Sequence, residues 1–304
     1  MPSNTRVVKN QGKYVGRFAP SPSGPLHFGS LLAATASFLD AKACDGLWLM
    51  RMEDLDPARE PAGVAQIILN QLLEFGLQWD GDVLYQSTRL AAYDSALKHL
   101  QAQGVCFQCD CSRPQIKAMG GTYNGACRSR LTPPVNDFAI RVLVNNEVLQ
   151  FKDLIQADYQ HSLGSDTGDF VIRRKDTLTA YQLAVVVDDA FQGINTVIRG
   201  IDLLDSTPRQ IYLQQLLAYS SPVYGHIPII VNNIGQKLSK QHFAAPLKSQ
   251  HKLELLHRVI ELLGQQPPAK NRLLSTGQQL DWAIDNWELG AIPKLATMPS
   301  NYSP

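Results

Sequence analysis

The chain has 304 residues, of which 44% are apolar and 18% are charged. This composition is typical of a folded enzyme that is large enough for one domain with appendages or for two domains. The chain has no apolar run of about 20 residues, which excludes a membrane-spanning helix, and its polar N-terminus lacks a secretory signal core. We therefore expect a cytoplasmic protein, and the formal net charge of +1 neither requires nor excludes a nucleic acid partner.

The first hundred residues alternate between strand and helix patterns. Apolar periodicity predicts two strands and two helices, at residues 14–18, 47–52, 28–44 and 64–75. Ser87 is the expected N-cap of a third helix, which Gly104 ends. Such alternation predicts an α/β fold with a Rossmann-like, doubly wound parallel sheet, in which ligands bind beyond the carboxyl ends of the strands.

Residues 106–178 interrupt this alternation. They contain cysteines, a glycine pair, a proline pair and two short strand-like runs, at 138–144 and 170–173, and we expect an inserted subdomain. The alternation then resumes, with helices expected at 181–191, 209–219, 253–263 and 278–288 and strands at 196–198 and 227–231. The predicted division is a first Rossmann-like half, the insertion, a second Rossmann-like half and a short helical C-terminal region, at 1–105, 106–178, 179–245 and 246–304.

Two separate segments have the residues of a phosphate site. The first is Pro20-Ser21-Pro22-Ser23-Gly24-Pro25-Leu26-His27-Phe28-Gly29-Ser30, and it leads into the first expected helix. Helix N-termini attract phosphate, Gly29 permits close approach of a nucleotide, and His27 can donate hydrogen bonds to developing negative charge. The second is Lys237-Leu238-Ser239-Lys240-Gln241, whose lysines can close over a leaving pyrophosphate. Either segment alone is equally consistent with a histidine in a turn or a solvated basic loop.

Together the two segments resemble the ATP signatures of class I aminoacyl-tRNA synthetases. This resemblance implies activation of an amino acid as its adenylate, with ATP and Mg²⁺. It implies catalytic roles for His27, Gly29, Lys237 and Lys240. The implied ATP-binding residues are His27, Gly29, Ser30, Lys237, Ser239 and Lys240.

Three longer segments resemble the glutamyl- and glutaminyl-tRNA synthetases. They are Arg17-Phe18-Ala19-Pro20-Ser21-Pro22-Ser23-Gly24, Leu49-Met50-Arg51-Met52-Glu53-Asp54-Leu55-Asp56 and Ile198-Arg199-Gly200-Ile201-Asp202-Leu203-Leu204-Asp205-Ser206-Thr207. The resemblance implies a glutamate site formed by Arg17, Phe18, Ala19, Pro20, Ser21, Glu53, Tyr181 and Arg199. Two arginines suit the two carboxylates, each able to form a bidentate pair, and Glu53 suits the ammonium group. Which arginine takes the α-carboxylate is left open.

About 60 residues follow the Lys240 loop, fewer than a typical further domain needs. In this respect the chain resembles a shortened subgroup of the family. That resemblance implies activation of L-glutamate without tRNA and its transfer to the queuosine base at the wobble position of tRNA(Asp), by a monomer. Three alternatives stay open: a short enzyme that charges the 3′ end of tRNA(Glu), a glutaminyl enzyme, and a catalytically silent tRNA-binding paralogue. Arg173, Arg174 and Lys175 form either an RNA contact or an ordinary surface cluster.

The cysteine spacing C-x-C-x11-Y-x3-C indicates a metal site. In a cytosolic protein, Cys109, Cys111 and Cys127 favour metal over disulfides, and three thiolates with one further ligand suit one structural zinc ion per chain. The family resemblance implies that Tyr123 is the fourth ligand, and Asp110 or water are the alternatives. Of the two remaining cysteines, Cys44 is expected in the core and Cys106 as a small buried apolar residue.

Overall fold

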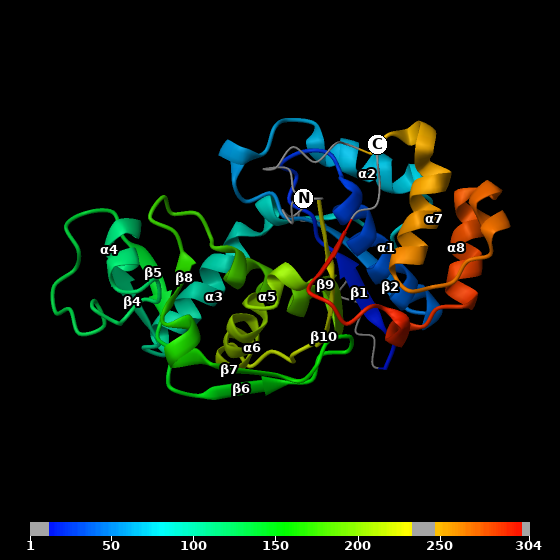
Figure 1. Cartoon of the computed structure of the whole chain (residues 1–304). Coiled ribbons are helices and arrows are strands. Elements are labelled where there is room, and N and C mark those ends of the chain that lie inside the picture. Colours follow the sequence, from blue (N-terminus) through cyan, green and yellow to red (C-terminus); the bar gives the residue numbers. More distant parts are fainter. Residues whose placement is uncertain (1–11, 233–246, 300–304) are drawn as a thin grey trace.

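Two groups of parallel strands form the centre of the molecule (Figure 1), in a computed structural model that describes residues 12–232 and 247–299. The strand order in the first group is β1 (Val15–Phe18), β2 (Leu47–Met52) and β3 (Leu84–Tyr85), and the second group pairs β9 (Thr196–Gly200) with β10 (Val223–Ile227). The groups lie side by side, since the Asn195 N–H beside β9 donates to the Val15 carbonyl of β1 at 3.1 Å. The carboxyl ends of β1, β2 and β9 therefore face the same region.

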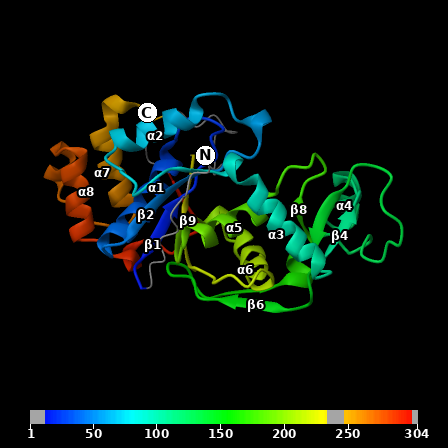
Figure 2. The same ribbon diagram turned by 180° about the vertical axis from the view of Figure 1, so that it is seen from behind.

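Helices lie on both sides of these strands, as Figures 1 and 2 show from opposite directions. One side carries α1 (Phe28–Ala43), α2 (Val64–Glu74), α7 (Lys252–Leu262) and α8 (Thr276–Asp285), and the other carries α3 (Leu90–Ala102), α5 (Tyr181–Gln192) and α6 (Ser206–Leu216). Neighbouring residues of β2 point to opposite faces, as the pleat requires: Trp48 is buried in the α1 core, whereas Leu49 packs against Val15 and Tyr224. This arrangement confirms the predicted α/β class and the parallel sheet.

The region expected as an insertion is built from antiparallel strands. Its elements are β4 (Cys106–Cys109), α4 (Arg113–Ala118), β5 (Ala139–Val142), β6 (Val148–Phe151), β7 (Tyr159–Ser162), a π-helical turn (Leu163–Thr167) and β8 (Phe170–Arg173). Strand β5 pairs with both β4 and β8, and β6 pairs with β7. Figure 1 places β4, α4, β5 and β8 at the end of the molecule opposite α7 and α8.

The C-terminal region adds a strand as well as the expected helices. Strand β12 (Thr297–Pro299) runs parallel to β11 (Ile229–Val231), and α7 and α8 share the core of α1. A capping box in which Ser275 and Gln278 bond reciprocally begins α8. Short 3-10 turns are at Pro57–Arg59, Gln86–Arg89, Ile201–Leu203, Ser249–His251, Ala269–Leu273 and Leu289–Ala291. No helix within the described ranges combines the length and apolar content needed to span a bilayer.

The prediction that Ser87 is the N-cap of α3 is wrong. A 3-10 turn (Gln86–Arg89) precedes α3, and Arg89 is the residue at the N-cap position. The Ser87 backbone N–H and hydroxyl both donate to the Asp54 carboxylate, at 2.9 and 2.6 Å. The Ser87 side chain, which the local pattern assigned to the helix N-terminus, thus bonds to a residue distant in sequence instead.

Three other expectations also need correction. Pro228 has no N–H for a sheet, and it divides the strand expected at 227–231 into β10 and β11. The helix expected at 209–219 begins at Ser206 and ends at Leu216, before Ala218 adopts a positive φ of 54°. Cys44 lies after the last turn of α1 and is exposed, so it is not a core residue.

Candidate active site and metal centre

The expected glutamate-binding residues converge at the carboxyl ends of the central strands. Arg17 is near the end of β1, Glu53 directly follows β2, Arg199 is near the end of β9, and Tyr181 is the first residue of α5. The two loops are tied together, since the Glu53 N–H donates to the Pro20 carbonyl at 3.0 Å. Because the strands are parallel, residues distant in sequence meet at one edge of the sheet.

A buried charge network supports two of these side chains. Arg51, which is fully buried, donates from Nη1 to Asp189 Oδ1 at 2.7 Å and lies 3.4 Å from Glu53 Oε1 through Nη2. Arg17 Nε reaches the same Asp189 oxygen at 3.4 Å. Asp189 therefore holds two guanidinium groups in place, and a buried charge is retained only when it is paired in this way.

Arg199 uses two of its three nitrogens within the protein. Nε donates to His226 Nε2 at 3.2 Å, and Nη2 donates to Thr207 Oγ1 at 2.7 Å. Nη1 is buried and has no hydrogen-bond partner among the described residues. We expected Arg199 to bind a carboxylate through two nitrogens. Only Nη1 is available, and it is suited to bind an external anion.

Burial shapes the acid–base character of the site. It raises the pKa of Glu53 above its ordinary value, opposed by the positive charges of Arg51 and Arg17. It also raises the pKa of Tyr181, on which Arg199, Glu53 and Arg17 all act. The Tyr181 hydroxyl therefore stays protonated and can donate as well as accept a hydrogen bond.

A pocket of about 660 Å³ opens beside these groups. Its lining includes three expected site residues, Ser21, Glu53 and Tyr181. Its remaining lining is more highly charged and consists of Ser23, Leu55, Asp56, Arg59, Glu60, Gln86, Arg174, Thr179 and Ala180. The volume exceeds that of an amino acid, so the pocket has room for a second reactant.

His27 and the start of α1 form the expected phosphate side. His27 is the N-cap of α1, and its Nδ1 accepts from the Ser30 N–H at 3.2 Å. An accepting Nδ1 places the ring proton of neutral imidazole on Nε2, which is then a donor. Gly29 and Ser30 occupy the first turn, where helix N–H groups favour an anion.

The second expected phosphate segment, with Lys237, Ser239 and Lys240, lies outside the described residues. The chain is described again from Leu247, whose N–H donates to the Leu26 carbonyl at 3.3 Å. Leu26 directly precedes His27, so the chain that follows the lysine segment begins beside the phosphate side of the site.

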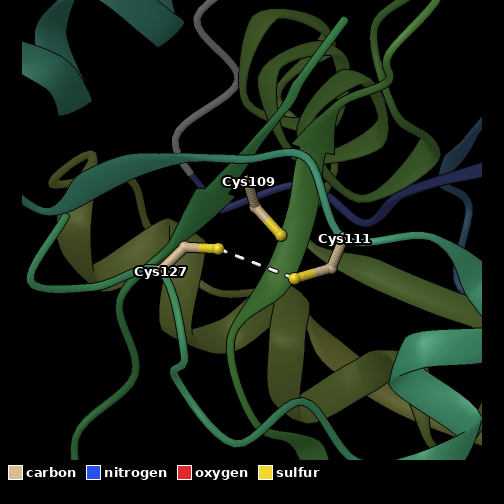
Figure 3. Close-up of side chains that lie close together, drawn as sticks. All are labelled: Cys109, Cys111 and Cys127. Carbon is tan, nitrogen blue, oxygen red and sulfur yellow. Dashed lines mark hydrogen bonds between the residues drawn. The ribbon is translucent and has the colours of Figure 1, made fainter. Parts of the chain in front are cut away.

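The three cysteines with the expected spacing form one cluster, drawn in Figure 3. Their Sγ atoms all lie within 4.8 Å of one another, and those of Cys111 and Cys127 are 3.6 Å apart. A tetrahedral zinc site with bonds of about 2.3 Å places its sulfurs about 3.8 Å apart. The spacing of this donor set therefore fits a zinc ion.

Tyr123 belongs to the same cluster. It packs with Cys109 and Cys127, and its hydroxyl oxygen accepts from the Cys127 N–H at 2.8 Å. Asp110, the alternative ligand, is instead paired with Arg130 at 2.8 Å. The structure thus brings the phenol, and not this carboxylate, among the thiols.

Arg141 supplies positive charge to the cluster. Its guanidinium carbon lies 4.2 Å from the centre of the Tyr123 ring. Burial disfavours the Cys109 thiolate, but hydrogen bonds from Arg141, the Cys111 backbone and Tyr123 outweigh it and hold the pKa of Cys109 below its usual value. Burial and the neighbouring thiols raise the pKa of Cys111 to about 11. A divalent cation would reverse this second effect, because a coordinated thiol is deprotonated.

Two other expectations concern residues around the cluster. Cys106 lies on β4 and is half-buried, less buried than expected, and burial raises the pKa of its thiol to about 12, which agrees with an unreactive thiol. The basic cluster is tied to its surroundings: Arg173 pairs with Asp94, Arg174 pairs with Asp56 and Asp176, and the Lys175 ammonium donates to the Asp110 carbonyl.

Sequence patterns did not assign roles to Arg51, Asp189, Asp153 or His226. For the first two, a signal was present: each is a charged residue inside an otherwise apolar strand or helix pattern. Such residues are almost never fully buried unless they are paired. Arg51 and Asp189 pair with each other, however, across 138 positions of sequence. No local pattern predicts such a pair.

The parallel core, the strand-end charges and the N-cap histidine define a class I aminoacyl-tRNA synthetase catalytic domain. The family model described as "tRNA synthetases class I (E and Q), catalytic domain" matches residues 13–283, so the chain belongs to this family.

Comparison with individual proteins shows more specific similarities within this family. A Pseudomonas aeruginosa protein named Glutamyl-Q tRNA(Asp) synthetase is 49% identical over 94% of this chain and 97% of the relative. A Pseudomonas putida protein with the same name is 47% identical over 98% of each. Among solved structures, that of glutamate-tRNA synthetase from Elizabethkingia anophelis matches this chain with a TM-score of 0.78 and 22% sequence identity. The match covers 94% of this chain and 68% of the chain in that structure. That likeness shows the fold.

Proposed function

We propose that this protein activates L-glutamate with ATP and transfers the glutamyl group to the queuosine base at the wobble position of tRNA(Asp). The observation that carries the proposal is the near-full-length similarity to relatives named for this activity. The charges of the site support it independently. Two arginines and one glutamate complement a substrate with two carboxylates and one ammonium group.

Activation begins when an α-carboxylate oxygen of glutamate attacks the α-phosphorus of ATP and pyrophosphate leaves. Arg17 and Arg199 hold the substrate carboxylates, and Glu53 holds its ammonium group. His27 donates from Nε2 to the developing phosphate charge, with the first turn of α1 beside it. Lys237 and Lys240 act on the departing pyrophosphate, and Mg²⁺ bound with ATP would offset part of the phosphate charge. These residues catalyse by positioning and charge stabilisation.

In the transfer step, a hydroxyl group of queuosine attacks the acyl carbon of the adenylate. An ester bond forms, the bond to phosphate breaks, and AMP leaves with the electron pair. The charged lining residues Asp56, Glu60 and Arg174 form the proposed acceptor side, where RNA would exchange the 2.7 Å ion pair between Arg174 and Asp56 for contacts of its own. Acidic groups there suit the secondary ammonium of queuosine, and arginine suits RNA phosphate.

The first half-reaction is tested by ATP–pyrophosphate exchange in the absence of tRNA. We expect exchange that depends on L-glutamate and that L-glutamine does not support, since the amide lacks the second negative charge. Purified protein with bound ATP but no glutamate-dependent exchange would contradict the proposal and favour a silent paralogue.

We further propose that Cys109, Cys111, Tyr123 and Cys127 hold one structural zinc ion. The sulfur spacing and the position of the Tyr123 hydroxyl support this donor set. A bound zinc ion would tie β4 to the loop containing Tyr123 and Cys127, and the guanidinium of Arg141 would offset part of the negative charge of the ligands. The division into four regions, the cytoplasmic location and the monomeric state remain predictions.

The fourth zinc ligand is tested with a pair of variants. Tyr123→Phe removes a direct ligand and should weaken zinc binding by at least the roughly 10- to 100-fold that follows loss of a group supporting a ligand. Asp110→Asn should leave the affinity near that of the parent, because Asp110 is paired with Arg130. Competition with a chelator of known affinity measures both. The reverse ranking of the two variants would assign the ligand to Asp110.

A further inference from the structure

Arg199 is part of a closed, buried hydrogen-bond network that joins three separate segments of the chain. Besides the bonds from Arg199 to His226 and Thr207, the Thr207 hydroxyl lies 3.0 Å from His226 Nε2. On the other side of the ring, His226 Nδ1 lies 2.5 Å from Asp153 Oδ2. Each of these four side chains is at most 4% exposed. None of the four side chains lines the 660 Å³ pocket.

The network determines the tautomer of His226. A guanidinium can only donate, so His226 Nε2 must accept from Arg199 Nε. The ring proton of the neutral imidazole is then on Nδ1, which donates to Asp153 Oδ2. Burial, assisted by the charge of Arg199, lowers the pKa of His226 below its usual value. The Asp153 carboxylate opposes this shift, but the net direction favours the neutral form that the arrangement requires.

Asp153 is itself fixed by the backbone. Its Oδ1 accepts from the N–H groups of Ile155, Gln156 and His226, at 2.9, 2.8 and 3.1 Å. The carboxylate cannot rotate without losing these bonds. Oδ2 is consequently directed at the imidazole, and the ring of His226 is directed at Arg199.

The ring of Tyr224 completes the support. It stacks on His226, with ring centres 6.3 Å apart and an interplanar angle of 10°, and it lies 5.2 Å from the guanidinium carbon of Arg199. Contacts with His226, Thr207 and Tyr224 fix the orientation of the Arg199 side chain before any ligand binds. A preset side chain loses less conformational entropy when it binds a carboxylate.

We propose that Asp153 and His226 are positioning residues that direct Nη1 of Arg199 at a carboxylate of the bound glutamate. Asp153 fixes the tautomer of His226, and His226 accepts the Nε–H of Arg199, so that Nη1 is the nitrogen left for substrate. This inference rests on the proposed activation of glutamate and adds residues outside the expected glutamate set.

The sharpest test is Asp153→Asn, which replaces the acceptor oxygen Oδ2 with an NH2 donor, removes the negative charge and keeps the shape of the side chain. The three backbone N–H groups keep the amide oxygen at the Oδ1 position, so the amide NH2 faces His226 Nδ1. Nδ1 of His226 must then accept a hydrogen bond, so the ring proton moves to Nε2. There it faces the Nε–H of Arg199, and two donors cannot form a hydrogen bond with each other. We expect the KM for glutamate to rise roughly 10- to 100-fold, the loss typical of a hydrogen bond to a charged group, with kcat of exchange and the KM for ATP little changed.

Asp40→Asn is the matched control. Asp40 is 5% exposed and accepts hydrogen bonds from Tyr14 and Trp287 at the far end of α1, away from Arg199. A similar rise of the glutamate KM in both variants would assign the effect to general loss of a buried carboxylate and overturn the proposal. An unchanged glutamate KM in a folded Asp153→Asn protein would also overturn it.

A measurement on the parent protein does not depend on any variant. Nitrogen chemical shifts of labelled histidine should show His226 as the neutral Nδ1–H tautomer, and assignment comes from the signal lost in His226→Gln. An Nε2–H tautomer or an imidazolium would contradict the inference. Absence of glutamate-dependent exchange in the parent protein would instead count against the proposed function, because the tautomer is measured without substrate.

Discussion

Arg199→Ala is expected to raise the KM for glutamate in ATP–pyrophosphate exchange about a hundredfold or more. Nη1 of Arg199 is buried and has no hydrogen-bond partner within residues 12–232 and 247–299, so we expect a bound carboxylate to supply its counter-charge. Removing one member of a buried ion pair costs about 3–5 kcal/mol, and about 1.4 kcal/mol corresponds to a tenfold change.

This variant should remain folded. Without the arginine, the Thr207 hydroxyl can donate to His226 Nε2, from which it is 3.0 Å away, so no acceptor on the imidazole is left unpaired. Arg199→Lys restores the charge but not the planar group that contacts both His226 and Thr207, and we expect only partial recovery. Arg258→Ala, which removes a surface ion pair with Glu261, should change neither binding nor stability by much. A parent-like glutamate KM for Arg199→Ala would remove Arg199 from the site.

Cys109→Ser is expected to abolish the zinc content and to lower the free energy of unfolding by about 3 kcal/mol or more. Structural zinc contributes directly to folding, because the unfolded chain holds no preformed site. Cys109 is the last residue of β4 and is 1% exposed, so the change falls inside the packed cluster. Elemental analysis gives the metal content, and denaturant unfolding gives the stability.

The control for this variant is Cys44→Ser. Cys44 is exposed at the end of α1 and is not part of the cysteine cluster. It should leave both the zinc content and the stability unchanged. Chelation of the parent protein should reproduce the destabilisation seen in Cys109→Ser. If the parent protein, purified without chelator, contains no zinc and is as stable as Cys109→Ser, the metal proposal is wrong.

Local patterns predicted the central α/β fold well because its elements are regular. The run at 47–52 became β2 with the same bounds, and the helical face that follows Pro61 became α2, since apolar periodicity reports which face is buried. Ser87 shows the limit of this reasoning. Its side chain could cap a helix, but Asp54, brought close by the fold, binds it instead.

The same limit applies to the site. Arg17, Glu53 and Arg199 stand in segments long enough to resemble a known family, so their convergence was predictable. The residues that orient them were not. Asp153 and His226 are 73 positions apart in the sequence, the first just after β6 and the second in β10. Only the folded chain shows that Asp153 determines which nitrogen of His226 has the proton.

The central claim is tested most directly by following labelled glutamate into RNA. The protein is incubated with ATP, labelled L-glutamate and tRNA(Asp) prepared with and without queuosine, and the product is digested to identify the labelled nucleotide. We predict label on queuosine, and only in the modified tRNA. Label on the 3′-terminal adenosine of tRNA, with none on queuosine, would contradict the account and identify an enzyme that charges tRNA ends.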